Sequence, residues 1–344
     1  MPKAKPPKVS LSGELEKAFF SKKIEQNQVL ALKRLCEGYH RQKQSLWRES
    51  VYRPYSCYFG FLTALKTKRV FQELKVWGYL ERFQQSKISL LDYGAGSLGG
   101  SLGAYEFFKG EGLSIDRVIA VDRDPRPVDW AKTEFAAFLP SEVSFAKRWP
   151  RLKKSSAQIH LMANVWNEIW QNPKSQFTKN WLAQLRLASR DDLFIIIEPA
   201  DKLTNQRLLR FRDQLRNLTQ ILLPCTHALA CPALAQDEWC HEEVEYSAPA
   251  RYWELVRKLG FRKSRLSFSL LVFGQQASAF SETQARVVSQ DVGGKGRCEK
   301  FLCMKGRRWK ESLLVRDQNE KNQGFFSAPR GGVIDSRSTL SREA

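Results

Sequence analysis

The chain has 344 residues, of which 42% are hydrophobic, so it can bury at least one full core and has room for a subdomain or tails. No run approaches the roughly 20 apolar residues that span a bilayer, which argues against a membrane protein. The first residues contain no apolar stretch that could act as a signal peptide, and we expect a cytoplasmic protein.

The charge is strongly unbalanced, with a formal net charge of +20. Residues 1–75 hold sixteen Lys or Arg against six Asp or Glu, and a second basic stretch covers residues 297–310. An excess of this size attracts polyanions through the long-range field and counterion release. We therefore expect RNA or DNA as the partner, with simple solubility as the alternative explanation.

The N-terminal part combines a basic arm with a helical region. Residues 1–10 are rich in Pro and Lys and have too few apolar side chains to fold alone, which predicts a flexible basic arm. Apolar residues then recur at helical spacing, and we expect a helical N-terminal region over residues 11–86. Arg53-Pro54 is expected to break it between two helices.

From residue 87 the pattern changes to short apolar runs separated by enough chain for a helix. Strands that alternate with helices predict an α/β fold with a parallel, doubly wound sheet. A late helix and a long apolar strand suit the closing hairpin of the methyltransferase variant of this sheet. We therefore expect a methyltransferase-like Rossmann domain over residues 87–275, with a Cys-rich insertion at 224–242. The expected strands are residues 88–92, 117–122, 158–163, 192–198 and 266–273, and the late helix is 251–259.

The pattern loses its regularity after residue 275. We expect residues 276–320 to form a C-terminal extension, in which strands at 300–304 and 312–315 pair as a hairpin around Lys305-Gly306. Residues 321–344 are rich in Gly and Ser at their end and are expected to be a mobile tail.

A glycine loop follows the first expected strand, in the sequence Asp92-Tyr93-Gly94-Ala95-Gly96. Gly94 and Gly96 allow positive φ and close approach of a ligand, and the next helix would present free N–H groups. This geometry suits dinucleotides and S-adenosylmethionine alike. S-adenosylmethionine is favoured because Asp92 can face the methionine ammonium, while Asp122, which ends the second strand, can accept hydrogen bonds from both ribose hydroxyls. A purely structural turn is the alternative.

The sequence assigns no catalytic residue. A methyltransferase would position its substrate at Asn164-Val165-Trp166-Asn167-Glu168, after the strand at 158–163, but this segment lacks the Asn-Pro-Pro-aromatic signature of amino-group methylation. A cysteine nucleophile for pyrimidine chemistry is not evident either. We expect Asn164 and Glu168 to cap the helix that follows.

Three of the seven cysteines, Cys225, Cys231 and Cys240, lie within sixteen residues, with prolines and histidines close by. This spacing favours thiolate ligands in a reducing compartment over a disulfide framework, and buried structural cysteines are the alternative. Four thiolates can hold tetrahedral zinc or a cubane iron–sulfur cluster, and spacing alone does not choose.

A fourth ligand would have to come from elsewhere in the chain. We favour Cys303 over Cys298 because Cys303 lies within the expected hairpin, from where it would attach the C-terminal extension to the sheet domain. Cys36 and Cys57 lie in helical patterns and are expected in the core.

Several of these segments together resemble a known family, the methyltransferase-like proteins of small-ribosomal-subunit assembly, which are known from mitochondria and have bacterial relatives. The resemblance extends over roughly residues 45–320, and the cysteine motif is its most specific part. The segments that carry it are Leu91-Asp92-Tyr93-Gly94-Ala95-Gly96, Ile197-Glu198-Pro199 with Arg212, and Cys225-x-His227…Cys231-Pro232…Trp239-Cys240-His241.

The resemblance implies that the protein assembles or monitors the small subunit by binding its ribosomal RNA, in contact with ribosomal proteins. It further implies an S-adenosylmethionine-type pocket at Asp92, Gly94, Gly96 and Asp122. It also implies a [4Fe-4S] cluster on Cys225, Cys231, Cys240 and Cys303. The chain departs from the family pattern at Ser97, where the family usually has Gly-Pro after the small residue, and at Glu242, where an aromatic residue often stands.

Three hypotheses follow. The leading one is a monomeric RNA-binding assembly factor, without membrane contact, that has a structural cluster and little or no catalysis. The second is an active S-adenosylmethionine-dependent rRNA methyltransferase. The third is a nucleic-acid-binding protein whose cluster senses redox state.

Overall fold

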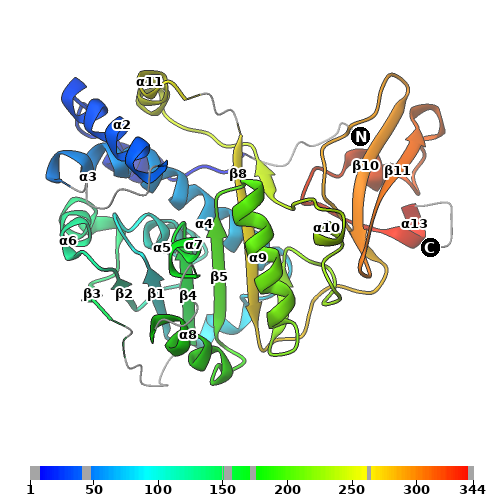
Figure 1. Cartoon of the computed structure of the whole chain (residues 1–344), viewed down its shortest axis with the longest axis horizontal. Coiled ribbons are helices and arrows are strands. Elements are labelled where there is room, and N and C mark those ends of the chain that lie inside the picture. Colours follow the sequence, from blue (N-terminus) through cyan, green and yellow to red (C-terminus); the bar gives the residue numbers. More distant parts are fainter. Residues whose placement is uncertain are drawn as a thin grey trace.

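The protein consists of a large mixed sheet covered by helices on both faces and a small antiparallel sheet beside it (Figure 1). Within the residues that the structure describes, no helix is long and apolar enough to cross a bilayer. The computed structural model describes residues 8–40, 48–148, 150, 157–170, 176–261 and 265–339.

The large sheet contains eight strands: β1 (Ile88–Tyr93), β2 (Arg117–Val121), β3 (Glu142–Ala146), β4 (Ala157–Ala163), β5 (Leu193–Glu198), β6 (Gln220–Leu223), β7 (Glu242–Val244) and β8 (Leu266–Gly274). Their order is β3-β2-β1-β4-β5-β8-β6, and β7 pairs with β8. Strands β1 to β5 are parallel, whereas β8 runs antiparallel to β5, β6 and β7. This order is the methyltransferase variant of the Rossmann-like doubly wound sheet, which confirms the predicted fold class.

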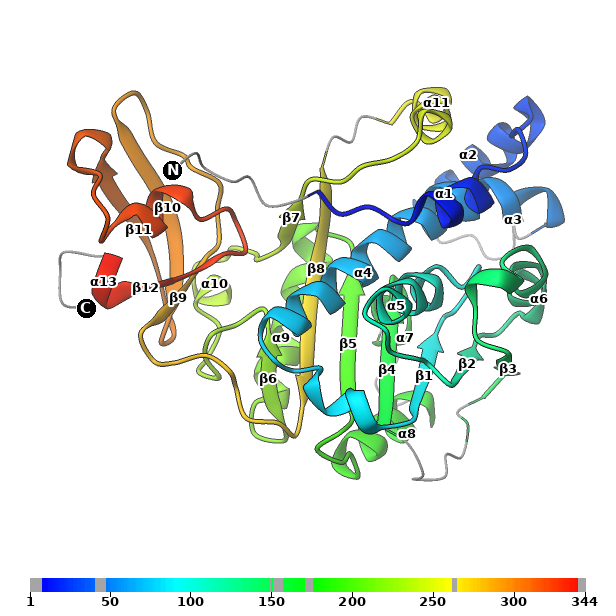
Figure 2. The same ribbon diagram turned by 180° about the vertical axis from the view of Figure 1, so that it is seen from behind.

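Each face of the sheet has its own hydrophobic core, because successive side chains of a strand point to opposite faces. In β1, Ile88 and Leu90 join the core beneath α4 (Phe61–Val76), α5 and α6, whereas Leu91 and Tyr93 join the core beneath α7, α8 and α9 (Figures 1 and 2). The described helices between β1 and β8 are α5 (Gly99–Gly110), α6 (Pro125–Glu134), η3 (Ala136–Phe138), α7 (Trp166–Trp170), α8 (Gln176–Arg186), α9 (Lys202–Leu215), α10 (Pro232–Ala235) and α11 (Ala250–Leu259).

The N-terminal region is helical, as expected: α1 (Gly13–Phe19), α2 (Gln26–His40), α3 (Glu49–Tyr55), η1 (Ser56–Gly60), α4 (Phe61–Val76) and η2 (Glu81–Gln85). The predicted break at Arg53-Pro54 was wrong, because Pro54 lies inside α3 and the chain continues into α4. Pro54 removes one helical hydrogen bond, and the π-helix η1 directly after α3 absorbs the change in register.

The end of the predicted basic arm is docked on the large sheet domain. Val9 is buried, donates its N–H to the Glu245 carbonyl at 3.0 Å, and accepts the Ser247 N–H at 2.9 Å. Residues 1–7 lie outside the described residues.

The small sheet has the order β11-β10-β9-β12. It contains a hairpin at the predicted turn, where Lys305 and Gly306 both have positive φ, as a type I′ turn requires. The second strand begins at Arg307, not at residue 312 as predicted, and residues 300–304 pair with residues 307–311. Its elements are β9 (Gln284–Val287), β10 (Arg297–Met304), β11 (Arg307–Leu314), η4 (Val315–Asp317), α12 (Gln323–Ser327), β12 (Val333–Asp335) and α13 (Ser336–Thr339).

The segment expected to be a mobile tail differs from that expectation up to residue 339. Phe325 of α12 is fully buried in the core of the small sheet, and β12 pairs with β9. The buried ammonium of Lys300 donates to the carbonyls of Phe325, Phe326 and Ala328, which anchors this segment. Residues 340–344 lie outside the described residues.

A buried ionic group joins the two sheets. Arg286 of β9 bonds Glu73 of α4 at 3.1 Å and Glu242 of β7 at 2.9 Å, and all three side chains are less than 10% exposed. Glu242, which the sequence analysis noted only as a departure from the family pattern, thus has its carboxylate bonded to Arg286 across the junction.

Candidate functional site

The glycine loop forms a sharp left-handed turn between β1 and α5. Gly94, Gly96 and Leu98 all have positive φ, at 65°, 49° and 59°. The Gly94 N–H donates to the carbonyl of Val121 at 2.7 Å, which ties the loop to the end of β2. We call the loop, together with Asp92, Asp122 and the segment 164–165 beside it, the glycine-loop edge.

Asp92 and Asp122, the two predicted cofactor acids, lie on this edge in different settings. Asp92 is 2% exposed and accepts hydrogen bonds from the Ser101 N–H at 3.0 Å and hydroxyl at 2.7 Å, in the first turn of α5. Burial raises the pKa of Asp92 to about 7. Asp122 is half-buried and accepts the Gly96 N–H at 2.9 Å and the Asp124 N–H at 3.1 Å. Its oxygens keep lone pairs that could accept ligand hydroxyls.

Val165 fills the space that a side chain on Gly94 would occupy. A Cβ added to Gly94 would lie 2.4 Å from Cγ2 of Val165, whereas one added to Gly96 would meet only the Gly94 carbonyl at 3.8 Å. Val165 follows Asn164, a non-glycine residue with a φ of 59°. A side chain at position 94 is therefore excluded by packing as well as by backbone conformation.

The glycines that follow the loop serve helix packing. A Cβ at Gly99 would lie 2.6 Å from the Gly60 carbonyl, and one at Gly103 would lie 2.2 Å from the Ala64 carbonyl. Helices α4 and α5 therefore touch backbone to backbone. The chain uses small residues here for reasons that are independent of a ligand.

A polar group lies at the carboxyl ends of β4 and β5, next to the glycine loop. Asn164 donates to the Thr63 hydroxyl at 3.1 Å and accepts from the Lys66 ammonium at 3.5 Å, both in α4. Glu198 accepts the Trp166 N–H at 2.8 Å at the start of α7. Burial raises the pKa of Glu198 to about 8, although Lys66 and backbone N–H groups of α7 oppose the shift.

This arrangement corrects one expectation. Glu198, not Asn164 or Glu168, receives an N–H at the start of α7, and Glu168 instead pairs with Arg123 at 3.4 Å. The sequence could have indicated Glu198, because it is an acid at the end of a buried apolar run. Lys66 had no such signal, because α4 lies far from β4 in the sequence.

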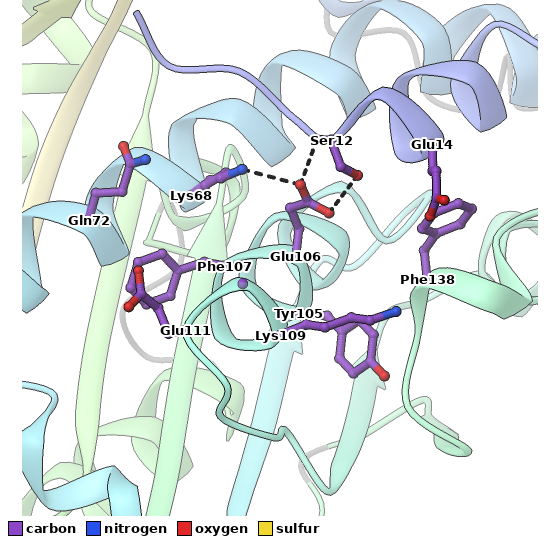
Figure 3. Close-up of a pocket in the computed structure, with 11 residues that line it drawn as sticks. Ser12, Glu14, Lys68, Gln72, Tyr105, Glu106, Phe107, Lys109, Glu111 and Phe138 are labelled. Carbon is purple, nitrogen blue, oxygen red and sulfur yellow. Dashed lines mark hydrogen bonds and ion pairs between the residues drawn. The ribbon is translucent and has the colours of Figure 1, made fainter. Parts of the chain in front are cut away.

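A cavity lies beneath the N-terminal segment, away from the glycine loop (Figure 3). It has a volume of about 390 Å³ between α4, α5 and the start of α1. The carboxylate of Glu106 accepts the Ser12 N–H at 2.6 Å, the Ser12 hydroxyl at 3.1 Å and the Lys68 ammonium at 3.2 Å. These three bonds hold the N-terminal segment on α5.

The four cysteines predicted as ligands line one small cavity of about 30 Å³, which we call the cysteine cavity. Cys225 follows β6, Cys231 precedes α10, Cys240 precedes β7, and Cys303 comes from β10 of the small sheet. All four are free thiols. Cys298 lies instead in the core of the small sheet, which separates the two candidates for the fourth position.

The thiols of the cysteine cavity lie in a setting that disfavours bare thiolates. Burial raises the pKa of Cys231 to about 11 and that of Cys240 to about 12, with further increases from Cys225 and, for Cys240, from Glu242. Burial also raises the pKa of Cys303, and the other three cysteines add to the shift. A bound cation would offset the mutual repulsion of several thiolates here.

Positive and polar groups complete the wall of the cavity. Arg212 of α9 is fully buried and donates to the carbonyls of His227 and Leu229 and to Asp213. Among the described residues, its Nε and the Nδ1 of His227 are buried without a hydrogen-bond partner. The Nε2 of His227 lies 3.5 Å from the Cys303 sulfur.

The fit of this cavity to a metal is partial. Over the ranges described, no group of three or more His, Cys, Asp or Glu side chains is arranged to hold a metal ion. Four convergent cysteines are nevertheless the donor set that structural zinc and iron–sulfur clusters take. A buried guanidinium beside them suits a centre with net negative charge. The ligand assignment stays a prediction.

Comparison with known proteins decides the family. The family model for the mitochondrial small ribosomal subunit protein Rsm22 matches residues 89–330. The chain belongs to the Rsm22 family. The match includes the glycine loop, all four cysteines of the cavity and most of the small sheet, and it confirms the predicted resemblance. No curated protein matches this Rsm22-family chain.

Solved structures similar to this Rsm22-family chain are methyltransferases. The 16S rRNA methylase ArmA is 12% identical, with 71% of this chain and 97% of that chain covered and a TM-score of 0.34. A precorrin-6y C5,15-methyltransferase from Geobacter metallireducens GS-15 is 12% identical, with 59% and 88% covered and a TM-score of 0.34. A methyltransferase from Thiobacillus denitrificans bound to S-adenosylhomocysteine is 13% identical, with 60% and 91% covered and a TM-score of 0.34. The strand order, not these matches, defines the fold.

Proposed function

We propose that this Rsm22-family protein is an assembly factor of the small ribosomal subunit that binds ribosomal RNA and acts mainly as a scaffold. Family membership supports a role at the small subunit, and the net charge of +20 is the observation that carries RNA binding. The hydrogen bonds that already engage Asp92 with Ser101 favour a scaffold over an enzyme.

The test of this proposal is association. The tagged protein, isolated from cells, should co-purify with small-subunit precursors and their RNA, and purified protein should bind small-subunit rRNA fragments more tightly than large-subunit fragments of equal length. Equal affinity for the two RNAs, together with no small-subunit RNA in the isolated material, would contradict the proposal.

We further propose that a [4Fe-4S] cluster is held by Cys225, Cys231, Cys240 and Cys303. When bound, it would supply four iron–thiolate bonds that fasten the small sheet to the large one. The convergence of these thiols on one cavity supports this assignment, and zinc is the alternative. Iron, acid-labile sulfide and zinc, measured on anaerobically purified protein, separate the two metals.

The alternative function is an active S-adenosylmethionine-dependent rRNA methyltransferase. It is favoured by the glycine loop and by Asp122, whose oxygens lie beside Gly96 and retain acceptor capacity. In this case Asp92, Gly94, Gly96 and Asp122 would hold the cofactor. Methylation of small-subunit RNA by purified protein, with turnover and with loss in Asp92→Ala, would establish it and displace the scaffold proposal.

A further inference from the structure

A basic groove lies between the segment 20–24, which links α1 to α2, and helix α11. It has a volume of about 220 Å³. Apolar side chains form part of its lining, and four cations surround them with one acid. The lining residues are Phe20, Lys22, Lys23, Ile24, Arg251, Glu254, Leu255 and Lys258.

The positive charge of this groove is not neutralised by its own acid. Glu254 is engaged with Lys258 at 2.7 Å, one turn along the same helix. Lys22 and Lys23 are exposed, and within the described parts of the chain neither forms a salt bridge. Four cations against one carboxylate leave an excess of three positive charges at neutral pH.

The groove is built on a fixed platform. Phe20 is 5% exposed and packs against Phe61 and Tyr252, with ring centroids 5.3 Å and 6.2 Å apart. The Arg251 guanidinium donates to the backbone carbonyls of Phe20 and Ser21, which holds the turn that carries the lysines. Because these partners are neutral carbonyl groups, the guanidinium keeps its full charge.

The position of the groove also suits a ligand that reaches the glycine-loop edge. Helices α2 and α11 contact each other beyond the edge at which the parallel strands end (Figures 1 and 2). Ligands of doubly wound sheets bind outside this carboxyl edge. Lys33 and Arg34 of α2 add further positive charge to this end of the molecule.

We propose that this groove binds the phosphodiester backbone of RNA, an inference that rests on the proposed RNA-binding function and locates it. Exposed lysines on a short turn provide point charges that match phosphates but not the fixed donor pattern that reads a base edge. The groove therefore contributes affinity and orientation, and it does not select a sequence. An acidic protein segment is the competing occupant.

The experiment compares two variants of equal net charge. Lys22→Gln/Lys23→Gln removes two cations of the groove, and Lys295→Gln/Lys321→Gln removes two exposed cations of the small sheet that form no salt bridge in the described ranges. Binding of a small-subunit rRNA fragment to the full-length protein is measured by fluorescence anisotropy between about 50 and 200 mM KCl, the range over which such contacts weaken.

The groove variant should bind more weakly than the wild-type protein. Its slope of log K against log salt concentration should become less negative by about 0.7–0.9 for each phosphate contact removed. The control variant should keep the wild-type slope. An unchanged slope in the groove variant, or an equal loss of affinity in both variants, would overturn the proposal that RNA binds in this groove. Neither result would contradict RNA binding by the protein as a whole. If the wild-type protein binds no RNA, the proposed function falls as well. If an acidic small-subunit protein co-purifies with the wild-type protein and the control variant but not with the groove variant, that protein is the occupant of the groove.

Discussion

The glycine-loop edge and the cysteine cavity differ in how far the protein satisfies its own atoms. At the glycine-loop edge, Asp92 is bonded to Ser101 and Val165 fills the space above Gly94. In the cysteine cavity, one buried cysteine (Cys231) and three partly buried ones lie together beside the buried guanidinium of Arg212. The acids of the loop already have hydrogen-bond partners within the protein, whereas the four cysteines are the donor set that a bound cation would engage.

This difference matters for function, because both features originate in one methyltransferase-like chain. The glycine loop is shared by many proteins, and here packing against Val165 and Gly60 accounts for Gly94 and Gly99. The cysteine cavity joins segments on either side of the junction between the sheets. A scaffold must keep its two sheets in a fixed arrangement, and this depends on the junction between the sheets and not on a cofactor pocket.

The largest effect is expected at the cysteine cavity. Cys→Ser at any one of its four cysteines should remove the metal, because each substitution deletes one of four thiolates. The small sheet should then become sensitive to limited proteolysis. Iron content and visible absorbance of anaerobic protein, together with the proteolysis pattern, provide the measurement.

Two matched substitutions serve as controls for this series. Cys36→Ser in α2 and Cys298→Ser in the core of the small sheet should keep full metal content. Full iron content in Cys303→Ser, together with loss of iron in Cys298→Ser, would identify Cys298 and not Cys303 as the fourth ligand. Stoichiometric zinc without iron or sulfide would replace the cluster with a zinc site.

A second large effect is expected where the two sheets meet without any metal. Arg286→Leu leaves Glu73 and Glu242 buried without their partner, which should destabilise the protein by about 3–5 kcal/mol. Urea unfolding measures the loss. Arg316→Leu, which removes an exposed pair with Asp317, should change stability by less than about 1 kcal/mol. Equal effects in the two variants would show that the buried ionic group does not stabilise the junction.

At the glycine-loop edge, Gly94→Ala should cost more stability than Gly96→Ala. Both residues have positive φ, which costs a side chain about 1–2 kcal/mol, and only Gly94 adds an overlap with Val165, worth about 1–3 kcal/mol more. Val165→Ala should partly rescue Gly94→Ala and leave Gly96→Ala unchanged. Equal losses in the two glycine variants, with no rescue, would indicate that Val165 does not fill this space in solution.

The sequence predicted most of the large sheet because its central strands are continuous apolar runs. It did not predict β3, β6 or β7, which are short or partly exposed and therefore give no clear apolar run. Three of the four cysteines were found because they lie close together in the sequence. Cys303 was found through the hairpin that contains it.

Interactions between distant segments could not be predicted in the same way. Lys66 meets Asn164, and Arg286 meets Glu73 and Glu242, only because the fold brings their elements together. No local spacing marks such pairs. The same reason explains the missed role of Phe325, which becomes a core residue only when the small sheet closes around it.

The smallest predicted effect is a pH dependence that arises from Asp92. Its pKa of about 7 in the folded protein lies above the ordinary value of 3.8, so the folded state binds the proton more tightly than the unfolded state. The stability contributed by this protonated carboxyl is fully present below pH 3.8 and is lost as the pH rises through about 7. Asp92→Asn removes this dependence.

The wild-type stability should therefore fall relative to Asp92→Asn by about 1 kcal/mol between pH 6 and pH 7, and the difference should level off above that range. Urea unfolding at each pH measures it, and Asp129→Asn, an exposed carboxylate on α6, is the control. S-adenosylmethionine bound with its ammonium against Asp92 would lower the pKa of Asp92 and flatten the wild-type curve. An unchanged curve at saturating S-adenosylmethionine agrees with a filled glycine-loop edge, whereas a flattened curve would show that the ligand reaches Asp92 and would favour the methyltransferase alternative.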